Sequence, residues 1–394
     1  MARIRKQAIQ LRELFDAQCD WLTGQTHSQA CSKPSLKASR FNCHFQFDFP
    51  QPKNNLPVLT AEEPATNLGH QGVFLAQAFM YSFSTCWNSH RHTDGRAMLR
   101  EIRDLGFEYA ELSHGTRISL LPGILEAVEA GEMKISSLHN FCPLPMGVHS
   151  SAPNLYQFSA ESPRERELAH RYTLKTLEFA ARVKAPAVVM HVGSIDMKEY
   201  TGKLLDLAAR GGRESPKYIK LCAELAQKRE AKKEPFFERT KEALKKILPE
   251  AESRDLKLGI ENRQALEELP LESDYPLLFR ELNNPSLVYW HDTGHAQIKE
   301  NLGFIRHALH LESLRDHLFG FHIHDVQFPG RDHCAPGSGT IDFAALAPAV
   351  QPRHLKVFEF SPGLTVADAK KGVEHISRAW GADATLSTAS PFTA

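Results

Sequence analysis

Short apolar runs alternate regularly with longer amphipathic stretches from about residue 75 almost to the end of the chain. The runs are FMYSF (79–83), FEYAEL (107–112), KISSLH (134–139), AVVMH (187–191), KLGIE (257–261), LVYWH (287–291), FGFHIH (319–324) and LKVFEF (355–360). Runs of this length and composition are typical of β-strands. Strands that alternate with helices indicate parallel β-α-β units, which build a doubly wound sheet or a closed barrel. Eight such runs favour the α/β class and the (β/α)8 TIM barrel.

The stretches between the runs have helical spacing. In 94–107, Met98, Leu99, Ile102 and Leu105 share one face and Gly106 is suited to end the helix. The stretches 161–183 and 237–255 have the same character. The segment from about 195 to 235 is too long for a simple loop, so we expect a helical insertion after the fourth strand.

The ends of the chain differ from its middle. Residues 1–72 are dominated by Pro, Ser, Asn and Gln after a short helical pattern. Neither the helical nor the strand period of apolar residues is sustained there. We expect a mostly disordered N-terminal extension over 1–72, a catalytic domain over 73–385 and a flexible tail over 386–394.

Charge and cysteine content exclude several kinds of partner and location. Lys plus Arg and Asp plus Glu are balanced at 47 each, which argues against nucleic acid or an anionic membrane as a partner. No apolar run approaches the length of a membrane span, and the N-terminus lacks the apolar core of a secretory signal. The seven Cys residues form no CxxC pair, which indicates reduced thiols. We therefore expect a cytoplasmic protein; its oligomeric state is left open, and a homo-oligomer is one option.

Histidines and carboxylates end six of the eight predicted strands. They are His139, His191, Glu261, the pair His291-Asp292, His322 or His324, and Glu359. In a TIM barrel the C-terminal ends of the strands carry the functional residues. Buried charges are costly unless they are paired or bind a metal, so packing does not explain this pattern. We expect these side chains to converge on one site.

Two Glu, one Asp and one His form a ligand set for a single divalent ion. This set suits Mn²⁺, Mg²⁺ or Co²⁺, with Zn²⁺ as an alternative, rather than a structural zinc site, which prefers Cys. A bound ion of this kind polarises a hydroxy-carbonyl group, and adjacent carboxylates can remove and return a proton. The predicted chemistry is the enolisation of a sugar.

Motifs along the chain identify a family resemblance. The sequence resembles the xylose isomerase-like TIM-barrel superfamily, particularly sugar phosphate isomerase/epimerase proteins, over about 77–382. The motifs are GFEYAELS (106–113), SSLHNFCP (136–143), VVMHVGS (188–194), LGIENR (258–263), WHDTGHA (290–296), FHIHD (321–325), APGSGTIDF (335–343) and VFEFS (357–361). The resemblance to ketose 3-epimerases implies the metal ligands Glu261, Asp292, His322 and Glu359, with Glu261 and Glu359 also acting as the catalytic acid/base pair.

The same superfamily contains the apurinic-site endonucleases, whose site holds three zinc ions. The resemblance extends to the additional histidines of that site, which match His139, His191, His295 and His333. It fails where those enzymes have Asp-x-His, because this chain has Arg331-Asp332-His333. In the epimerases the histidine that matches His295 contacts the substrate. A residue at about the position of His333 also contacts the substrate there, but it is typically Arg. The sugar specificity therefore stays open.

Several further residues have two interpretations. Glu111 is either a hydrogen-bonding residue of the rim or a substrate contact, and Arg263 either orients Glu261 or binds a substrate hydroxyl or phosphate. His324 is an alternative to His322 as the ligand, whereas strand alternation should point His291 away from the metal. The predicted substrate-binding set is His139, His191, His295, His333, Arg263 and Glu111; His114 and His149 are expected in solvated loops.

The leading functional hypothesis is a metal-dependent isomerase or epimerase of a monosaccharide, sugar phosphate or related polyol. A dehydratase or lyase begins with the same proton abstraction, so it is a close alternative. An endonuclease-like phosphodiester hydrolase and a binding barrel without turnover are the other two hypotheses. A phosphorylated substrate would need a backbone cradle, and Pro336–Gly339 offers N–H groups for one.

Overall fold

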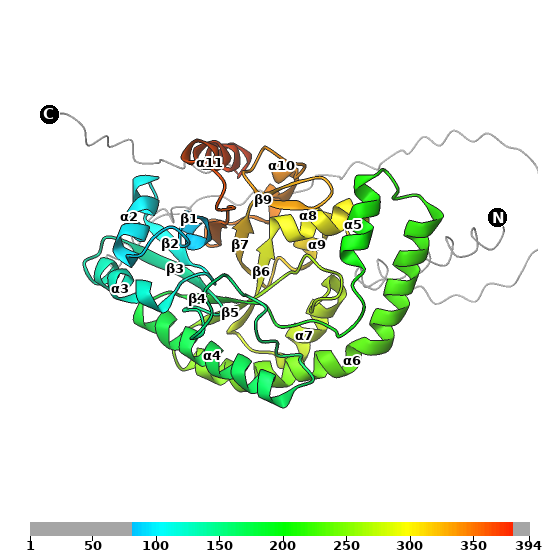
Figure 1. Ribbon diagram of the computed structural model, residues 1–394, viewed down its shortest axis with the longest axis horizontal. Coiled ribbons are helices and arrows are strands. Elements are labelled where there is room, and N and C mark those ends of the chain that lie inside the picture. Colours follow the sequence, from blue (N-terminus) through cyan, green and yellow to red (C-terminus); the bar gives the residue numbers. More distant parts are fainter. Residues whose placement is uncertain (1–80, 381–394) are drawn as a thin grey trace, which may run out of the picture. The chain divides into compact units, whose positions relative to one another are not determined.

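A closed barrel of eight parallel strands forms the centre of the computed structural model, which describes residues 81–380 (Figure 1). In order around the barrel the strands are β1 (Tyr81–Ser84), β2 (Tyr109–Leu112), β3 (Lys134–His139), β4 (Ala187–Met190), β5 (Lys257–Glu261), β6 (Leu287–Asp292), β7 (Leu318–Ile323) and β10 (Leu355–Phe358). Strand β10 pairs with β1, with Phe358 opposite Phe83, and this pairing closes the ring. The predicted TIM barrel is confirmed, and each of its eight strands overlaps one of the eight apolar runs.

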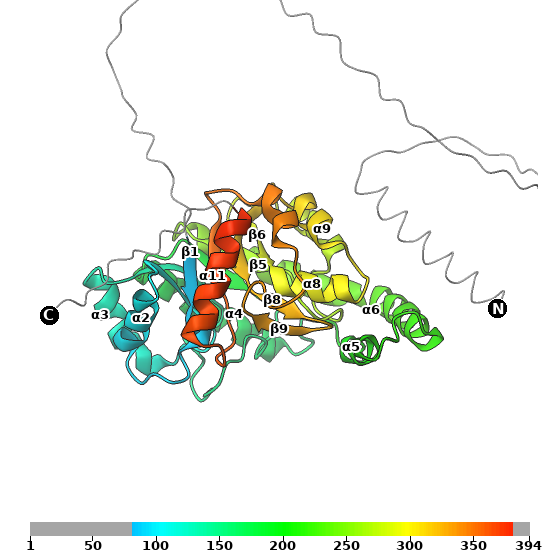
Figure 2. The same ribbon diagram turned by 90° about the horizontal axis from the view of Figure 1, so that it is seen from above.

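Helices surround the barrel, as seen from two directions in Figures 1 and 2. They are α2 (Gly95–Asp104), α3 (Leu121–Glu129), α4 (Pro163–Arg182), α5 (Thr201–Ala209), α6 (Pro216–Glu252), α7 (Tyr275–Leu282), α8 (Thr293–Asn301), α9 (His307–Ser313), α10 (Phe343–Leu346) and α11 (Val366–Trp380). Short 3-10 turns lie at Thr85–Trp87, Ile118–Leu120, Glu272–Asp274 and Ala347–Ala349. Side-chain caps begin the longer helices: the Asp94 carboxylate accepts from Arg96 N, and Ser162 Oγ accepts from Glu165 N. Gly106 follows α2 with φ 100°, as its predicted role requires.

The predicted insertion after the fourth strand is confirmed. It forms α5 and the first half of α6, which at 37 residues continues without a break into the helix that leads to β5. Both helices stand out from the barrel in Figure 1. Tyr218 of α6 donates a 2.6 Å hydrogen bond to the Leu302 carbonyl, and the buried Arg229 guanidinium lies 3.3 Å from Asp274. These contacts fix α6 against the segments that follow β5 and β6.

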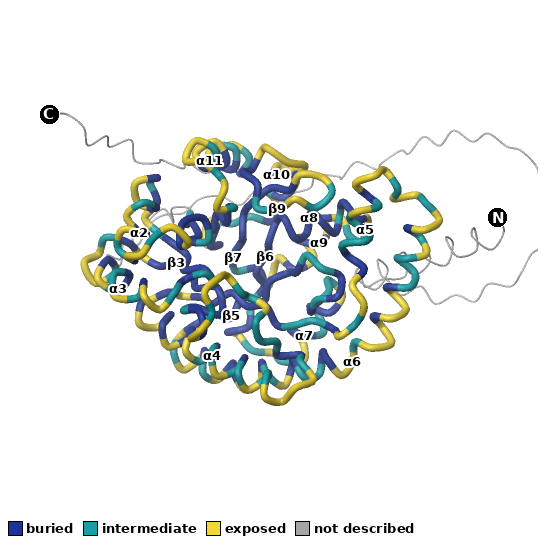
Figure 3. The backbone as a smooth tube through the Cα atoms, viewed as in Figure 1, coloured by how far each residue is buried: buried dark blue, intermediate teal, exposed yellow. Residues whose placement is uncertain are grey.

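Two separate groups of apolar side chains stabilise the domain. The larger lies between strands and helices, and the strands appear as a buried centre in Figure 3. The smaller fills the barrel interior with Ala187, Val189, Trp290, Leu355 and Val357. The Trp290 indole occupies space left free by two glycines: a Cβ atom on Gly259 or Gly320 would lie only 3.0 Å or 2.4 Å from it. The Trp290 ring packs edge-on against the His322 ring, with ring centroids 5.3 Å apart.

Polar side chains from β1, β2 and β3 line the other half of the barrel interior. Glu111 is fully buried there and accepts hydrogen bonds from Ser84 Oγ at 2.9 Å and from Ser137 Oγ at 2.8 Å. Beyond β7 the chain forms an antiparallel hairpin of β8 (Asp325–Gln327) and β9 (Arg331–Cys334). This hairpin brings His333 back toward the barrel.

Some expectations concern segments outside the described residues. The N-terminal extension over 1–72 and the tail over 386–394 both lie there, so they stay predictions. Within 81–380, none of the helices combines the length and the apolar character that crossing a membrane requires.

A candidate metal centre at the C-terminal ends of the strands

Four acidic and imidazole side chains meet at the C-terminal end of the barrel. They are Glu261, Asp292, His322 and Glu359, and one donor atom from each lies within 4.8 Å of the others. All four are buried. They come from β5, β6, β7 and the residue after β10, at positions where strand alternation directs the side chain inward. The four residues predicted as metal ligands are thus neighbours in space.

His322 lies at the centre of this group. Its Nδ1 atom is 2.8 Å from Glu261 Oε1, 3.3 Å from Glu359 Oε2 and 4.0 Å from Asp292 Oδ2. Its Nε2 atom is 3.0 Å from Glu111 Oε2. Histidines that bind metals usually donate their second ring N–H to a carboxylate, which fixes the tautomer and the ring orientation. The donor set and this supporting contact both fit a divalent cation.

The charges in the group stabilise one another. Burial by itself would lower the pKa of His322, but Glu359, Glu111 and Glu261 raise it well above its ordinary value. Burial would raise the pKa of Glu261, yet His322 and His191 hold it well below the ordinary range. The carboxylates therefore stay ionised around one shared positive charge. A divalent ion would replace that charge with His322 as a neutral ligand.

Asp292 and Asn262 join the ends of β5 and β6. Asp292 begins helix α8, where Oδ1 accepts from His295 N at 2.7 Å, while Oδ2 lies 3.0 Å from His324 Nε2. Asn262 Oδ1 accepts from Asp292 N at 2.6 Å, and Asn262 Nδ2 donates to the Asp292 carbonyl. His295 Nδ1 lies 2.9 Å from the Asn262 carbonyl, which orients the ring toward the group. These backbone contacts hold the Asp292 carboxylate in one direction.

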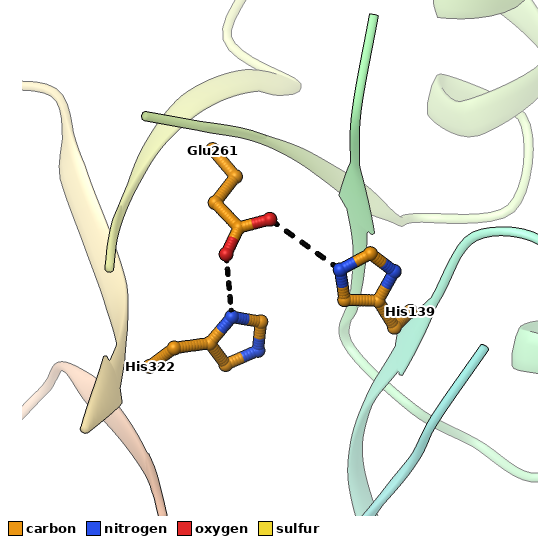
Figure 4. A group of neighbouring side chains, drawn as sticks. All are labelled: His139, Glu261 and His322. Atoms are coloured by element: carbon orange, nitrogen blue, oxygen red, sulfur yellow. Dashed lines mark hydrogen bonds and ion pairs between the residues drawn. The ribbon is translucent and has the colours of Figure 1, made fainter. Parts of the chain in front are cut away.

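Two histidines flank Glu261 on the side of β3 and β4. Figure 4 shows the Glu261 carboxylate between His139, at 3.4 Å, and His322. His191 Nε2 lies 2.7 Å from Glu261 Oε2, and its Nδ1 lies 2.8 Å from Asn154 Oδ1. Burial and the Arg263 charge lower the pKa of His191 well below its ordinary value, so the ring is neutral.

Arg263 connects Glu261 to the surrounding loops. Its Nη1 atom lies 3.2 Å from Glu261 Oε2 and 2.5 Å from His191 Nε2. Its Nε and Nη2 atoms donate to Glu268 Oε1 at 3.2 Å and 3.1 Å. This geometry corresponds to the first of the two predicted roles, the orientation of Glu261. Glu111 likewise occupies the hydrogen-bonding role, beneath His322.

A second group of possible ligands lies on the other side of Glu359. His324, His333 and Glu359 have donor atoms within 4.8 Å of one another. The rings of His324 and His333 are stacked with centroids 4.2 Å apart, and His333 N donates to His324 Nδ1 at 2.9 Å. His333 has φ 51°, an uncommon conformation for a residue other than glycine, and Asp332 lies 3.3 Å from its ring. The hairpin thus holds His333 beside the candidate centre.

Two sequence-based expectations are corrected here. His114 is half-buried rather than fully solvated: its ring packs edge-on against His139 with centroids 4.7 Å apart, and burial of the ring lowers its pKa to about 3. The glycine-rich loop at 336–339 is not free to cradle a phosphate, because the Gly337 and Gly339 N–H groups each donate to Asp325 Oδ2 at 2.9 Å. The protein's own carboxylate occupies the position that an anion would take.

Other expectations agree with the contacts. His291 points away from the centre, with its Nδ1 at 2.8 Å from Tyr289 Oη, and His149 is exposed. The supporting roles of Asn262, Asn154 and Glu268 were missed. Asn262 belongs to a quoted motif, which was a usable signal. Asn154 and Glu268 lie in irregular loops, where no periodicity marks them.

Comparisons with known proteins agree with this architecture. A family model described as xylose isomerase-like TIM barrel matches residues 99–361. A solved D-tagatose 3-epimerase-like protein is similar, with 17% identity, a TM-score of 0.54 and coverage of 77% of this chain and 97% of that one. An L-ribulose 3-epimerase matches with 14% identity, TM-score 0.57 and coverage of 77% and 95%. A 3-keto-D-glucoside 4-epimerase from E. coli matches with 14% identity, TM-score 0.55 and coverage of 76% and 99%. No curated protein sequence matches significantly.

Proposed function

This chain belongs to the xylose isomerase-like TIM-barrel family, and from that premise we propose that it is a divalent-metal-dependent sugar isomerase or epimerase. The observation that carries the proposal is the convergence of Glu261, Asp292, His322 and Glu359 on one buried point. Two of these four are glutamates from strands on either side of β6 and β7. A pocket that only binds a sugar has no need of two buried carboxylates beside a cation.

Glu261, Asp292, His322 and Glu359 would hold the ion. When bound, such an ion supplies a Lewis acid that polarises a carbonyl oxygen. Glu111 keeps the His322 ring in place, and Asn262 fixes the Asp292 carboxylate. The chain thereby pre-orients its ligands before any substrate arrives.

The two glutamates are the proposed proton carriers. One glutamate, as the carboxylate, removes the proton from the carbon next to the carbonyl, and the other, in its protonated form, delivers a proton to the opposite face. Arg263 lies 3.2 Å from Glu261 Oε2, which directs that carboxylate. His139, His191, His295 and His333 surround the pair and offer ring nitrogens to the substrate hydroxyls.

An unphosphorylated substrate is favoured. The sequence pointed to one glycine-rich loop near the strand ends, at 336–339. Its Gly337 and Gly339 N–H groups already donate hydrogen bonds to Asp325. The other described groups close to the centre are mainly carboxylates and imidazole rings, and the charged imidazoles face carboxylates, as His322 faces Glu261 and His333 faces Glu359. The Arg263 guanidinium is likewise paired, with Glu268. A phosphate group therefore lacks the donors it needs.

Proton exchange in D₂O tests the proposal. The full-length protein with Mn²⁺ should exchange the proton next to the carbonyl of at least one ketose or inosose-like polyol, as followed by NMR. Glu359→Gln keeps the shape of the side chain but removes the basic oxygen, so exchange should slow by roughly 10²–10⁴-fold. Glu281→Gln, on α7 and paired with Lys241, is the matched control and should exchange at the native rate. Metal content is measured in the same samples.

Native-rate exchange by fully metal-loaded Glu359→Gln would contradict the two-carboxylate mechanism. The same spectra distinguish the dehydratase and lyase alternatives, because loss of water or cleavage of a carbon–carbon bond gives different products.

An endonuclease-like hydrolase is the second candidate, and one observation favours it. Two further groups, His139–Glu261–His322 and His324–His333–Glu359, share ligands with the central four. Such overlap is what a site for several ions requires. Three zinc ions per chain with cleavage of abasic DNA would support the hydrolase, whereas one divalent ion supports the isomerase.

A further inference from the structure

A groove lies next to the candidate metal centre and has no part in the chemistry described above. It encloses about 680 Å³, within the range of about 300–1,000 Å³ found for ligand pockets. Asn154, Arg263 and Glu268 line it on the side of the centre. Asn154 and Arg263 also contact His191, and Arg263 contacts Glu261. The groove therefore shares a wall with the candidate centre.

The insertion after β4 builds the opposite wall. Asp196, Met197 and Glu199 precede α5, and Phe236 comes from α6; all four line the groove. This wall thus comes from the loop that leads into α5 and from the middle of α6.

Hydrogen bonds between three loops fix the groove. Gln157 Oε1 accepts from Ser194 N at 3.0 Å and from Ser194 Oγ at 2.7 Å, which joins the loop after β3 to the loop after β4. Glu267 accepts from Tyr200 N at 2.6 Å and from Thr201 Oγ1 at 2.7 Å, which joins the loop after β5 to the start of α5. A pocket held in this way is preformed and loses little freedom when a ligand binds.

The lining specifies the chemistry of the ligand. Its carboxylates are Glu161, Glu165, Asp196, Glu199, Glu267 and Glu268. Arg263 is its one basic residue, and that guanidinium already pairs with Glu268 and Glu261. A phosphate or a carboxylate would be repelled by this surface. Amide, hydroxyl and carboxylate groups beside the apolar Phe236 and Met197 suit a ligand with many hydroxyl groups and no charge.

We propose that the groove binds a second, uncharged sugar unit, so that the substrate is a neutral glycoside rather than a free or phosphorylated monosaccharide. The inference rests on the proposed function in that the first sugar unit occupies the metal centre. The second unit extends past Asn154 and Arg263 toward the insertion. The groove thereby selects substrates by length and by lack of charge.

Ligand-observed saturation-transfer NMR with the full-length, Mn²⁺-loaded protein tests the inference without requiring turnover. The probes are cellobiose, maltose and sucrose, their component monosaccharides glucose and fructose, and glucose 6-phosphate. At least one disaccharide should bind about tenfold more tightly than its components, which corresponds to about 1.4 kcal/mol. Glucose 6-phosphate should bind no better than glucose.

A matched pair of variants locates the binding. Ala160 lines the groove, so Ala160→Trp should weaken disaccharide binding about tenfold and leave monosaccharide binding within about twofold. Ala209 is exposed at the end of α5 and does not line the groove, so Ala209→Trp should change neither. Equal melting temperatures of the two variants establish that both are folded.

Two results would overturn the inference: no disaccharide binds more tightly than its components, or Ala160→Trp leaves disaccharide binding unchanged. Failure of the proposed function has a different signature. In that case no probe exchanges its proton in D₂O, while disaccharide binding still depends on Ala160.

Discussion

The two ring nitrogens of His322 face different surroundings, and this difference defines the candidate centre. Nδ1 faces Glu261, Glu359 and Asp292, whereas Nε2 faces Glu111. One side of the ring is therefore available to a cation and the other is held by a carboxylate. Without Glu111 the ring would lose the contact that fixes its tautomer. The roles of the individual residues stay predictions that substitution can test.

Asp292→Asn should weaken Mn²⁺ binding while the barrel stays folded. The amide still accepts the hydrogen bond from His295 N that begins α8, but it lacks the charge that attracts a cation. Titration calorimetry should show at least about a tenfold loss of affinity, about 1.4 kcal/mol. Asp342→Asn is the control, because Asp342 begins α10 in the same manner outside the group. Unchanged Mn²⁺ affinity in Asp292→Asn would remove this residue from the ligands.

At the scale of single elements, strand β6 separates two polar environments. Trp290 and Asp292 point into the barrel, where one fills the interior and the other reaches the centre. Tyr289 and His291 point outward into a buried network with His307 and His310. Alternation along one strand thus places a possible metal ligand and a structural histidine at adjacent positions.

Gly320→Ala should destabilise the barrel and disturb the centre together. The new methyl group would lie 2.4 Å to 2.8 Å from three atoms of the Trp290 ring, which packs against His322. Overpacking of this kind costs about 1–3 kcal/mol, measurable by urea denaturation. Gly259→Ala is the matched comparison, because its nearest ring atom would be 3.0 Å away, and it should lose less stability. Equal stability of Gly320→Ala and wild type would show that Trp290 is not confined as described.

The network behind β6 predicts a dependence of stability on pH. Burial lowers the pKa of His307 from 6.5 to about 3 and that of His310 to about 4. Between pH 6.5 and about pH 4 both rings stay largely neutral in the folded state, whereas the unfolded chain takes up the protons. Stability should therefore fall as the pH drops from about 6.5 toward 4, by about 1.4 kcal/mol per pH unit for each such histidine.

Between pH 6 and pH 4, His307→Gln should reduce the slope of the unfolding free energy against pH by the contribution of about one proton. The slope, rather than the stability at one pH, is the measurement, because the substitution also alters packing. His149→Gln, at an exposed loop position, is the control and should keep the native slope. A His307→Gln slope equal to that of wild type would show that His307 is not held neutral.

On the scale of the whole molecule, the four candidate ligands come from the C-terminal ends of four strands of the closed barrel and meet at one point. The insertion adds a wall beside that point without interrupting the barrel, because α6 continues into the helix that precedes β5. A cation that bridges the strand ends should therefore stabilise the entire domain.

Removal of metal by EDTA should lower the melting temperature, and added Mn²⁺ should restore it. At a free concentration about 100 times the dissociation constant, binding contributes about 2.7 kcal/mol, a shift on the order of 5 °C in a domain of this size. Calorimetric melting and native mass spectrometry on the same sample measure both quantities. A metal-free protein with an unchanged melting temperature on Mn²⁺ addition would contradict a site built across the strand ends.

The sequence by itself determined the eight strands, the inserted helix and the set of polar residues at the strand ends. These features depend on the spacing of apolar and polar residues over short stretches of the chain, so they can be recognised from neighbouring residues alone. Glu261 could be selected because it ends an apolar run, and parallel strands bring such ends together. His322 was preferred to His324 through the family resemblance. The alternation of side chains along a strand also correctly predicted that His291 points away from the candidate centre.

Only the tertiary structure decided which of these groups support one another and which are already satisfied. Glu111 meets His322 across 211 positions of the chain, and the ring of the half-buried His114 packs against His139 from a loop that the sequence predicts to be solvated. The Asp325 carboxylate takes the N–H groups that the sequence offers to a phosphate. The groove likewise depends on three loops and α6 meeting in space. Such contacts depend on how distant segments pack, and no local pattern records them.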